Sequence, residues 1–300
     1  MVSVKELRVR IHSVGNIKQI TRAMEMVATT KLRRFQDRAV SSRPYAQEIA
    51  GLVGRLTQVL GDEVAERPLF QKGGGDKTLA LLVTSDRGLC GAYNSNMFRE
   101  LEDWLAARSE AGRGEDSVSF FVYGRKGAQY LTKRGLNVAS YLTEPPLEAL
   151  DFQAAAVASR MLQEEFLSGA YDEVVVLSTA FESMVKYVPA VNPFLPVSPD
   201  ALKAEDGPDS DDSADGDVIL EPDAGVIFDR LVPRYLETRI YNALLESLTS
   251  EYASKRFAMK NATEAANDMQ KLLRGIYNRK RQENITKELL DIVGGAEALK

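Results

Sequence analysis

One segment of the sequence has the residue types of a phosphate-binding turn. The stretch TSDRGLCGAYN, residues 84–94, contains two glycines and lies between a predicted strand and a predicted helix. Backbone N–H groups at a strand–loop–helix junction can bind phosphate. The stretch departs from G-x-G-x-x-G, however, and it lacks the Lys-Ser/Thr pair of a P-loop. A tight structural turn is therefore the favoured interpretation.

Other reactive side chains are sparse. Cys90 is the only cysteine and His12 the only histidine, and the two are far apart in the sequence, which argues against a catalytic thiol. A zinc site would need carboxylate ligands, and paired acids such as Glu164 and Glu165 are typical of solvated helix faces. We therefore expect no catalytic, cofactor-binding or metal-binding residue, and no cofactor.

The middle of the chain has the pattern of an α/β domain. Apolar segments predict strands at residues 77–83, 117–124, 136–143 and 171–183. Helical segments separate them at residues 94–112, 125–135 and 151–169, with Asn94 and Asp151 as expected N-caps. The Pro-containing segment 184–197 is expected at a sheet edge. This alternation predicts a mostly parallel, Rossmann-like sheet.

Both ends of the chain predict long helices with narrow apolar seams. The first seam is a heptad pattern with one three-residue stammer after Val14, and it contains Val4, Leu7, Ile11, Val14, Ile17, Ile20, Met24 and Val27. Pro44 is expected to end or kink this helix. The last helix carries an interrupted seam of Leu244, Leu248, Met269, Leu272, Ile276, Leu289 and Val293. Neither seam can be buried alone, so we expect the two helices to pair, with part of the longer C-terminal helix unpaired.

The predicted fold class is α/β plus long α. It consists of an antiparallel coiled coil of the N- and C-terminal helices with an inserted Rossmann-like, mostly parallel α/β domain. We expect four regions: the N-terminal coiled-coil helix at 1–57, the α/β domain at 76–200, an acidic mobile loop at 201–222 and the C-terminal coiled-coil helix at 223–300.

Charge is unevenly distributed along the chain, although the net charge is only −5. Residues 1–43 contain ten Lys and Arg against three acids, residues 255–287 contain nine against three, and residues 203–223 contain nine acids against one Lys. A basic helix binds nucleic acid, a membrane surface or an acidic protein. Between residues 278 and 288 the helix keeps one apolar residue, Ile285, while it becomes basic, which favours an acidic protein partner over a solvated face.

The amino-acid composition indicates the cellular compartment in which the protein is expected. The chain is 44% hydrophobic and 27% charged, and no apolar run approaches the roughly 20 residues of a membrane span. The opening MVSVKELRVR lacks the features of a signal peptide, and a single cysteine fits a reducing compartment. We expect a soluble bacterial cytoplasmic protein, with a processed organelle protein as the alternative.

Several ordered motifs resemble one known family, the gamma subunits of F-type ATP synthase of the bacterial type. They are ITRAMEMVATTKLRR at 20–34, SRPY at 42–45, TSDRGLCG at 84–91, LEPD at 220–223 and ITKELLDIVGGAEA at 285–298. The resemblance covers essentially the whole chain. It implies a non-catalytic central-stalk rotor shaft, which couples proton-driven rotation of the membrane ring to ATP synthesis or hydrolysis at the beta-subunit sites of an alpha3beta3 hexamer.

The same resemblance implies partners and a location. The partners are the alpha and beta subunits, the epsilon subunit and the c-ring, with no nucleic acid. The implied location is peripheral, at the cytoplasmic face of the bacterial inner membrane. One departure stands out, since Ala92 replaces a glycine that usually follows GLCG in the family, which argues against a close backbone approach at that point.

The resemblance also implies site residues. Coupling contacts to the beta subunit are expected at Met24, Arg281, Gln282, Thr286 and Glu288. A basic shaft face that meets an acidic loop of that subunit is expected at Lys18, Arg22, Lys31, Arg33 and Arg34. A rotor-ring contact is expected at Glu221.

Two other interpretations remain open from the residues alone. A nucleotide-dependent α/β enzyme would rest on the sheet pattern and the 84–94 turn, and ATP turnover by the purified chain would support it. A coiled-coil nucleic-acid binder would rest on the basic helices, and salt-sensitive DNA binding would support it. The acidic segment 205–217 has no firm role; if it is a solvated spacer, deletion of residues 204–216 leaves coupling intact.

Overall fold

The computed structural model describes residues 3–199, 202 and 223–297. The chain divides into two compact units, a helical unit of Met1–Thr30 with Lys255–Lys300 and an α/β unit of Lys31–Ser254. Two long helices, α1 (Val4–Leu60) and α6 (Ala224–Glu297), contribute residues to both units. The expected acidic loop at 201–222, apart from Leu202, lies outside the described residues, and so does Glu221.

The α/β unit is built on a five-stranded sheet in the order β3-β2-β1-β4-β5. The strands are β1 (Thr78–Val83), β2 (Val118–Tyr123), β3 (Asn137–Leu142), β4 (Glu173–Phe181) and β5 (Tyr187–Leu195). The first four are parallel, and β5 pairs with β4 in the antiparallel direction. All residues of β1 and β2 are buried, as expected for strands that are covered on both faces.

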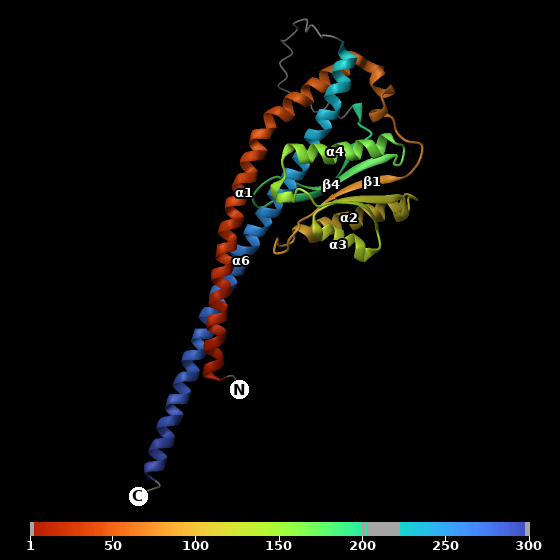
Figure 1. Cartoon of the computed structure of the whole chain (residues 1–300). Coiled ribbons are helices and arrows are strands. Elements are labelled where there is room, and N and C mark those ends of the chain that lie inside the picture. Colours follow the sequence, from red (N-terminus) through yellow and green to blue (C-terminus); the bar gives the residue numbers. More distant parts are fainter. Residues whose placement is uncertain (1–2, 200–201, 203–222, 298–300) are drawn as a thin grey trace. The chain divides into compact units, whose positions relative to one another are not determined.

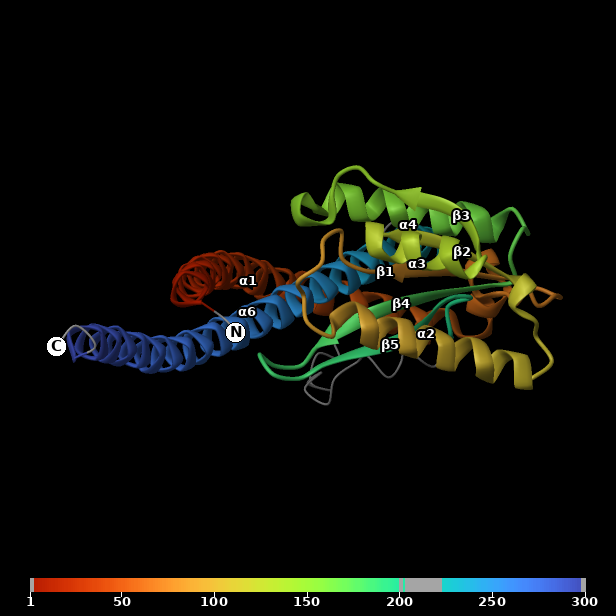
Figure 2. The ribbon, with the colours of Figure 1, turned by 90° about the horizontal axis from the view of Figure 1, so that it is seen from below.

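Helices cover both faces of this sheet. Helices α2 (Tyr93–Glu110) and α3 (Arg125–Arg134) lie on one face, and α4 (Phe152–Leu167) lies on the other (Figures 1 and 2). Alternate strand residues such as Ala80, Leu82 and Phe120 form one core cluster with Met97 and Leu101 of α2. Four short 3-10 helices complete the unit: Gly61–Glu66, Pro68–Phe70, Glu115–Ser117 and Leu147–Ala149.

The parts of α1 and α6 that belong to the α/β unit pack against each other and against α4. Ser42 of α1 donates to Asn242 of α6 at 3.3 Å. The rings of Phe35 and Tyr252 lie 5.4 Å apart, so the residue number falls along α6 as it rises along α1, as in an antiparallel pair. Phe152, the first residue of α4, contacts an aromatic ring on each of the two helices.

The helical unit is also an antiparallel pair of α1 and α6. Arg8 donates to the Tyr277 hydroxyl at 3.1 Å, and Lys18 donates to Asn267 at 2.7 Å. The Thr21 and Thr263 hydroxyl oxygens lie 2.8 Å apart. The antiparallel coiled coil predicted from the sequence is therefore confirmed.

The seam of this coiled coil differs from the predicted one. The buried and half-buried positions of α1 follow an unbroken heptad of Val4, Leu7, Ile11, Val14, Lys18, Thr21, Glu25, Ala28, Leu32 and Phe35. The predicted stammer after Val14 is wrong, because Ile17, Ile20 and Val27 are 52%, 59% and 56% exposed. Polar residues occupy the middle of the seam, so α1 carries a second apolar strip that points outward.

The seam of α6 is shifted in the same way. Its inward positions are Met259, Thr263, Ala266, Gln270, Leu273, Tyr277 and Lys280. The predicted seam residues Leu244 and Leu248 are fully buried in the α/β unit, whereas Met269, Leu272 and Ile276 are exposed. Every residue from Arg281 to Gly294 is exposed, so this part of α6 pairs with no other element among the described residues, as expected.

Most of the predicted elements are present, with instructive exceptions. Asp151 caps α4 by accepting from the Ala154 N–H at 2.8 Å, as predicted. Asn94 does not cap α2, since that helix begins at Tyr93 and the Asn94 side chain bonds to Ser85 instead. Helix α1 does not end at Pro44 but continues through it to Leu60. The Pro-containing segment forms the edge strand β5, as predicted.

Candidate functional site

The turn at residues 84–94 lies where a nucleotide would bind in a Rossmann-like sheet. Strand order reverses between β1 and β4, and ligands of open α/β sheets bind beyond the carboxyl ends of the strands at such a point. Several backbone N–H groups there are bonded within the protein. The Ser85 N–H donates to Asn94, and the Gly127 N–H donates to Thr84 Oγ1 at 2.8 Å.

The second loop at this edge is closed in the same way. The Arg125 N–H donates to Asp86, and the Lys126 N–H donates to the Ser85 carbonyl. A Cβ atom at Gly124, where φ is +106°, would lie 2.1 Å from the Thr84 carbonyl oxygen. The glycine is thus needed for two loops that touch each other.

Helix α6 covers the turn from outside. Ser254 donates to the Cys90 carbonyl at 2.6 Å, and Tyr187 of β5 donates to Ser254 at 3.0 Å. Ser247 accepts from the Thr179 N–H of β4 at 3.0 Å. Helix α6 is therefore bonded directly to the turn and to the strands beside it, and this geometry agrees with the structural interpretation of the turn.

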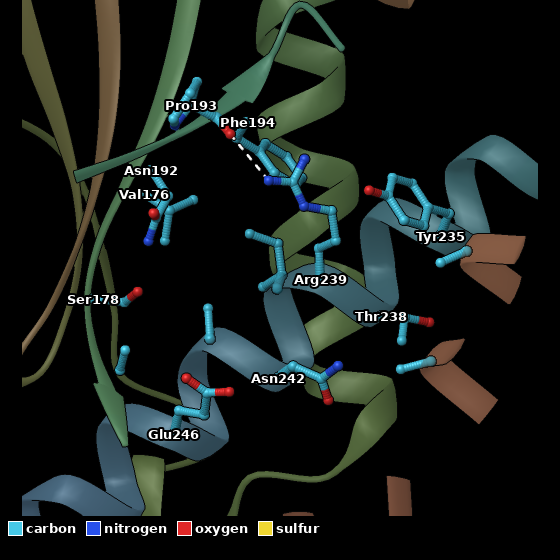
Figure 3. A pocket seen from close by; sticks show the side chains of 15 residues that line it. Val176, Ser178, Asn192, Pro193, Phe194, Tyr235, Thr238, Arg239, Asn242 and Glu246 are labelled. Atoms are coloured by element: carbon cyan, nitrogen blue, oxygen red, sulfur yellow. Dashed lines mark hydrogen bonds between the residues drawn. The ribbon is translucent and has the colours of Figure 1, made fainter. Parts of the chain in front are cut away.

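A cavity of about 260 Å³ lies between α6, α1 and strands β4 and β5 (Figure 3). Arg239 extends from α6 toward the sheet, donates to the Pro193 carbonyl at 3.1 Å and lies over the rings of Phe194 and Tyr235. The cavity is lined in part by the small side chains of alanines at positions 46, 50, 180 and 243. Because the guanidinium is held by its own surroundings, we assign the cavity to packing between sheet and helix.

Glu246 lies further along α6 in the same cavity (Figure 3). Burial raises the pKa of its carboxyl group, although a hydrogen bond to the Phe181 backbone and the nearby positive charge of Arg43 act in the opposite direction. A buried carboxyl with a raised pKa is a candidate general acid or base. Here it has no metal cluster beside it, since the described residues contain no group of three or more His, Cys, Asp or Glu that could hold a metal ion.

The predicted coupling residues fall in two separate places of the helical unit. Met24 is half-buried on α1, close to the Thr21–Thr263 contact. Arg281, Gln282, Thr286 and Glu288 are all exposed on the unpaired part of α6. Arg281 lies 18 residues beyond Thr263, or about 27 Å along the helix. The structure does not bring Met24 and the α6 residues together within the chain.

The predicted basic face is divided between the units. Lys18 and Arg22 belong to the helical unit, where they line a groove together with Arg8 and Arg274. In the α/β unit, Arg33 and Arg34 are exposed, whereas the Lys31 ammonium contacts Glu148 and lies 3.2 Å from the Tyr252 hydroxyl. Lys31 therefore has an internal partner.

Sequence reasoning missed the outward apolar strip of α1. Its members Ile17, Ile20 and Val27 belong to the predicted inward seam, yet all three are more than half exposed. The available signal was the irregular spacing after Val14, because a seam that breaks its heptad beside polar residues indicates two faces rather than one. An apolar strip of this kind is a candidate contact for a partner.

The fold and these surfaces define a class of protein that combines an α/β domain with two long antiparallel helices carrying exposed apolar and basic residues. Two loops of the α/β domain contact each other at its switch point. Within the described ranges, no helix combines the length and the apolar character needed to cross a membrane.

Comparison with known proteins gives the family. The model of the family described as ATP synthase matches residues 3–299. The ATP synthase gamma chain of Desulfosudis oleivorans is 40% identical and that of Cytophaga hutchinsonii 38% identical, each over 100% of this chain and at least 99% of the relative. The chain belongs to the ATP synthase gamma chain family.

A solved structure agrees with this assignment. It is the central stalk and c-ring of the Tetrahymena thermophila mitochondrial ATP synthase, in which one chain has a TM-score of 0.57 and 25% sequence identity. The match covers 81% of this chain and 99% of that chain. The two long helices and the mostly parallel sheet are thus a shared architecture.

Proposed function

We propose that the chain is the rotor shaft of the central stalk of an F-type ATP synthase. It is a non-catalytic subunit that couples ion-driven rotation of the membrane ring to ATP synthesis or hydrolysis at the beta-subunit sites. The match to gamma chains over the whole length carries this conclusion. The turn at 84–94 supports it, because Thr84 accepts from the Gly127 N–H and contacts Gly124, as in a structural turn.

The proposed partners are the alpha and beta subunits of the hexamer, the epsilon subunit and the c-ring. The similar Tetrahymena structure is a central stalk together with a c-ring, which supports a stalk position next to the membrane ring. Since the two relatives named above are bacterial, we place the subunit peripherally at the cytoplasmic face of the bacterial inner membrane.

The beta-subunit contacts are proposed at Met24, Arg281, Gln282, Thr286 and Glu288. This part of α6 supports the assignment, since all of its residues from Arg281 to Gly294 are exposed among the residues that the structure describes. Charge-assisted hydrogen bonds that change with rotation angle would couple rotation to the catalytic sites. Exposed ion pairs are worth less than about 1 kcal/mol each, so many weak contacts must act together.

The basic face is proposed to meet an acidic part of the beta subunit. Arg22, Arg33 and Arg34 are exposed and suit this role. Lys18 and Lys31 would contribute positive potential while their ammonium groups stay on internal partners, Asn267 and Glu148 respectively. The rotor-ring contact at Glu221 remains a proposal for a residue outside the described ranges.

Reconstitution tests the function directly. The purified chain is mixed with alpha and beta subunits, and stoichiometry, ATP hydrolysis and rotation of a probe on the chain are measured. We expect no ATP turnover by the chain alone, one copy per hexamer, and ATP-driven rotation of the assembly. ATP turnover by the isolated chain, or failure to join the hexamer, would contradict the proposal.

Arg281→Ala tests the coupling contacts on α6. We expect ATP hydrolysis to continue while ATP-driven proton pumping falls, because a contact that depends on rotation angle is lost. Arg279→Ala is the matched control: it removes the same charge from an exposed position, but two residues along a helix place it about 200° around the axis. Equal proton pumping by Arg281→Ala and Arg279→Ala would contradict the assignment of Arg281 as a coupling contact.

A further inference from the structure

The loop between β3 and α4 is held by both long helices of the α/β unit. Its 3-10 helix, Leu147–Ala149, inserts Leu147 into the core, and Leu150 follows, each with 1% of its surface exposed. Arg38 of α1 donates to the Leu150 carbonyl at 3.0 Å. The loop is therefore fixed by buried side chains from within and by a long side chain from α1.

Glu148 stands at the centre of this contact. One carboxylate oxygen contacts the Lys31 ammonium of α1, and the other contacts the Tyr252 hydroxyl of α6. The Lys31 ammonium also lies 3.2 Å from that hydroxyl and 5.4 Å from the centre of its ring. A single carboxylate of the inserted domain thus binds both helices, and each of the three side chains contacts the other two.

The chemistry keeps this network intact at working pH. Burial and the hydrogen bond to Glu148 raise the pKa of Tyr252, so its hydroxyl stays protonated and acts as a donor. The Tyr252 ring is packed against Phe35, with centroids 5.4 Å apart, so the hydroxyl is held in place by an apolar contact. A fully satisfied polar network of this kind rigidifies the elements that it joins.

The position of the network matters as much as its chemistry. The chain leaves α1 after Leu60 and returns to α6 at Ala224, which are the covalent attachments of the inserted domain. Lys31 lies 29 residues before Leu60, and Tyr252 lies 28 residues after Ala224. At a rise of 1.5 Å per residue, both are more than about 40 Å along their helices from those attachments. The network lies far from the covalent attachments, and it adds to the Arg38–Leu150 and Ser254–Cys90 hydrogen bonds that also join the domain to the helices.

We propose that Glu148 is a torque-transmitting residue, which fixes the inserted domain to α1 and α6 so that domain and helices turn as one body. This inference rests on the rotor function proposed above. The pair of Lys31 and Glu148 is partly exposed, with 38% and 35% of the two side chains accessible, so it adds little to folding stability. Its role is stiffness, and it can be removed without unfolding the domain.

The test measures torsional stiffness in the assembled complex. The hexamer is fixed to a surface, and a bead is attached to Ser109→Cys at the exposed end of α2; the sole natural cysteine, Cys90, is buried and does not compete for the label. Angular fluctuation of the bead is recorded while the motor pauses, and proton pumping per ATP is measured in parallel.

In Glu148→Ala we expect the angular variance to rise above that of the Glu144→Ala control, because the contact that joins the domain to both helices at once is lost. Pumping per ATP should fall, while ATP hydrolysis persists. Glu148→Gln, which keeps hydrogen bonds without the charge, should give a smaller rise. Tyr252→Phe keeps the ring on Phe35 and removes only the hydroxyl, so it tests the same contact even if Glu148→Ala folds poorly. Glu144→Ala, an exposed carboxylate four residues earlier, is the matched control.

Two failures are distinguishable. If the unmodified chain does not join the hexamer or rotate, the rotor function itself is wrong. If the unmodified chain rotates and the Glu148 and Tyr252 variants show the variance of the Glu144 control, Glu148 does not transmit torque and the rotor function stands.

Discussion

Polar side chains inside the α/β unit fasten elements to one another. Asn94 illustrates this: its amide bonds to Ser85 across the turn, with the carbonyl oxygen accepting from the Ser85 N–H and the amide nitrogen donating to the hydroxyl. The sequence pattern alone predicted a helix cap, because Asn at the start of a helix usually caps it. The tertiary contact could not be foreseen, since it depends on where the strand before the turn ends.

Glu246 offers a prediction about pH. Its pKa is raised in the folded protein, chiefly by burial, so the neutral form is the one that the fold favours. The resulting contribution to the free energy of unfolding is fully present below the pKa that the carboxyl has in the unfolded chain. It is lost as the pH rises through the pKa that the carboxyl has in the folded protein. Glu246→Gln cannot ionise and should therefore melt at a higher temperature than the unmodified chain at pH 7.5.

The pH series supplies the control for Glu246. Near pH 4 the unmodified carboxyl is also largely neutral, so the difference in melting temperature should shrink toward zero. Thermal unfolding followed by circular dichroism at both pH values checks this. A difference of the same size at both values would show that lost packing, rather than ionisation, governs the site.

At the scale of elements, the sequence predicted every strand of the sheet and the helices between them. Apolar runs such as TLALLV of β1 are unambiguous, because they are buried on both faces. The coiled-coil seam was less predictable. Three inward positions of α1 are polar, namely Lys18, Thr21 and Glu25. Ile17, Ile20 and Val27 are exposed instead, so the seam chosen by hydrophobicity lies on the wrong face of α1. The hydrophobicity of a helix face predicts that the face is covered, but it does not predict whether a helix of the same chain or a partner covers it.

Substitution of glycine by alanine should stabilise the protein at two helical positions and destabilise it at one turn position. A Cβ atom at Gly275 of α6 meets nothing within 4 Å, so Gly275→Ala should stabilise the protein by about 0.5–1 kcal/mol through helix propensity. At Gly15 the Cβ atom would lie 3.0 Å from the flexible end of Gln270, so the gain should be smaller. Urea unfolding followed at 222 nm measures both.

Gly124→Ala is the contrasting change. Its positive φ and the 2.1 Å approach to the Thr84 carbonyl predict destabilisation of at least about 2 kcal/mol in the same urea assay. If Gly124→Ala were as stable as the unmodified chain, the two loops at the switch point would not touch as described. The closed form of the turn would then be in doubt.

At the scale of the whole molecule, membership of the family was predictable because motifs occur along the entire chain, from residue 20 to residue 298. The internal partner of Lys31 was not predictable, because Glu148 lies 117 residues away in sequence. Residues that are close only after folding leave no periodic signal. Site assignments that rest on charge alone therefore need the fold before internal and external partners can be separated.

Removal of residues 281–300 separates folding from coupling. Because Arg281 to Gly294 are all exposed, the free energy of unfolding of the truncated protein should lie within about 0.5 kcal/mol of that of the full chain. ATP-driven proton pumping of the reconstituted complex should fall, because the proposed contacts at Arg281, Gln282, Thr286 and Glu288 are gone. A clear loss of stability on truncation would show that this part of α6 packs within the chain.

The outward apolar strip has a consequence for the cell. Ile17, Ile20 and Val27 on α1, together with Leu289 and Val293 on α6, remain in water whenever the subunit is on its own. Orphan copies made in excess of their assembly partners would stick to one another or be captured by chaperones and proteases. Because these apolar residues are exposed, the chain must be synthesised in balance with the subunits of the hexamer. Overproduction of this chain alone should yield aggregates, and co-production of its partners should prevent them.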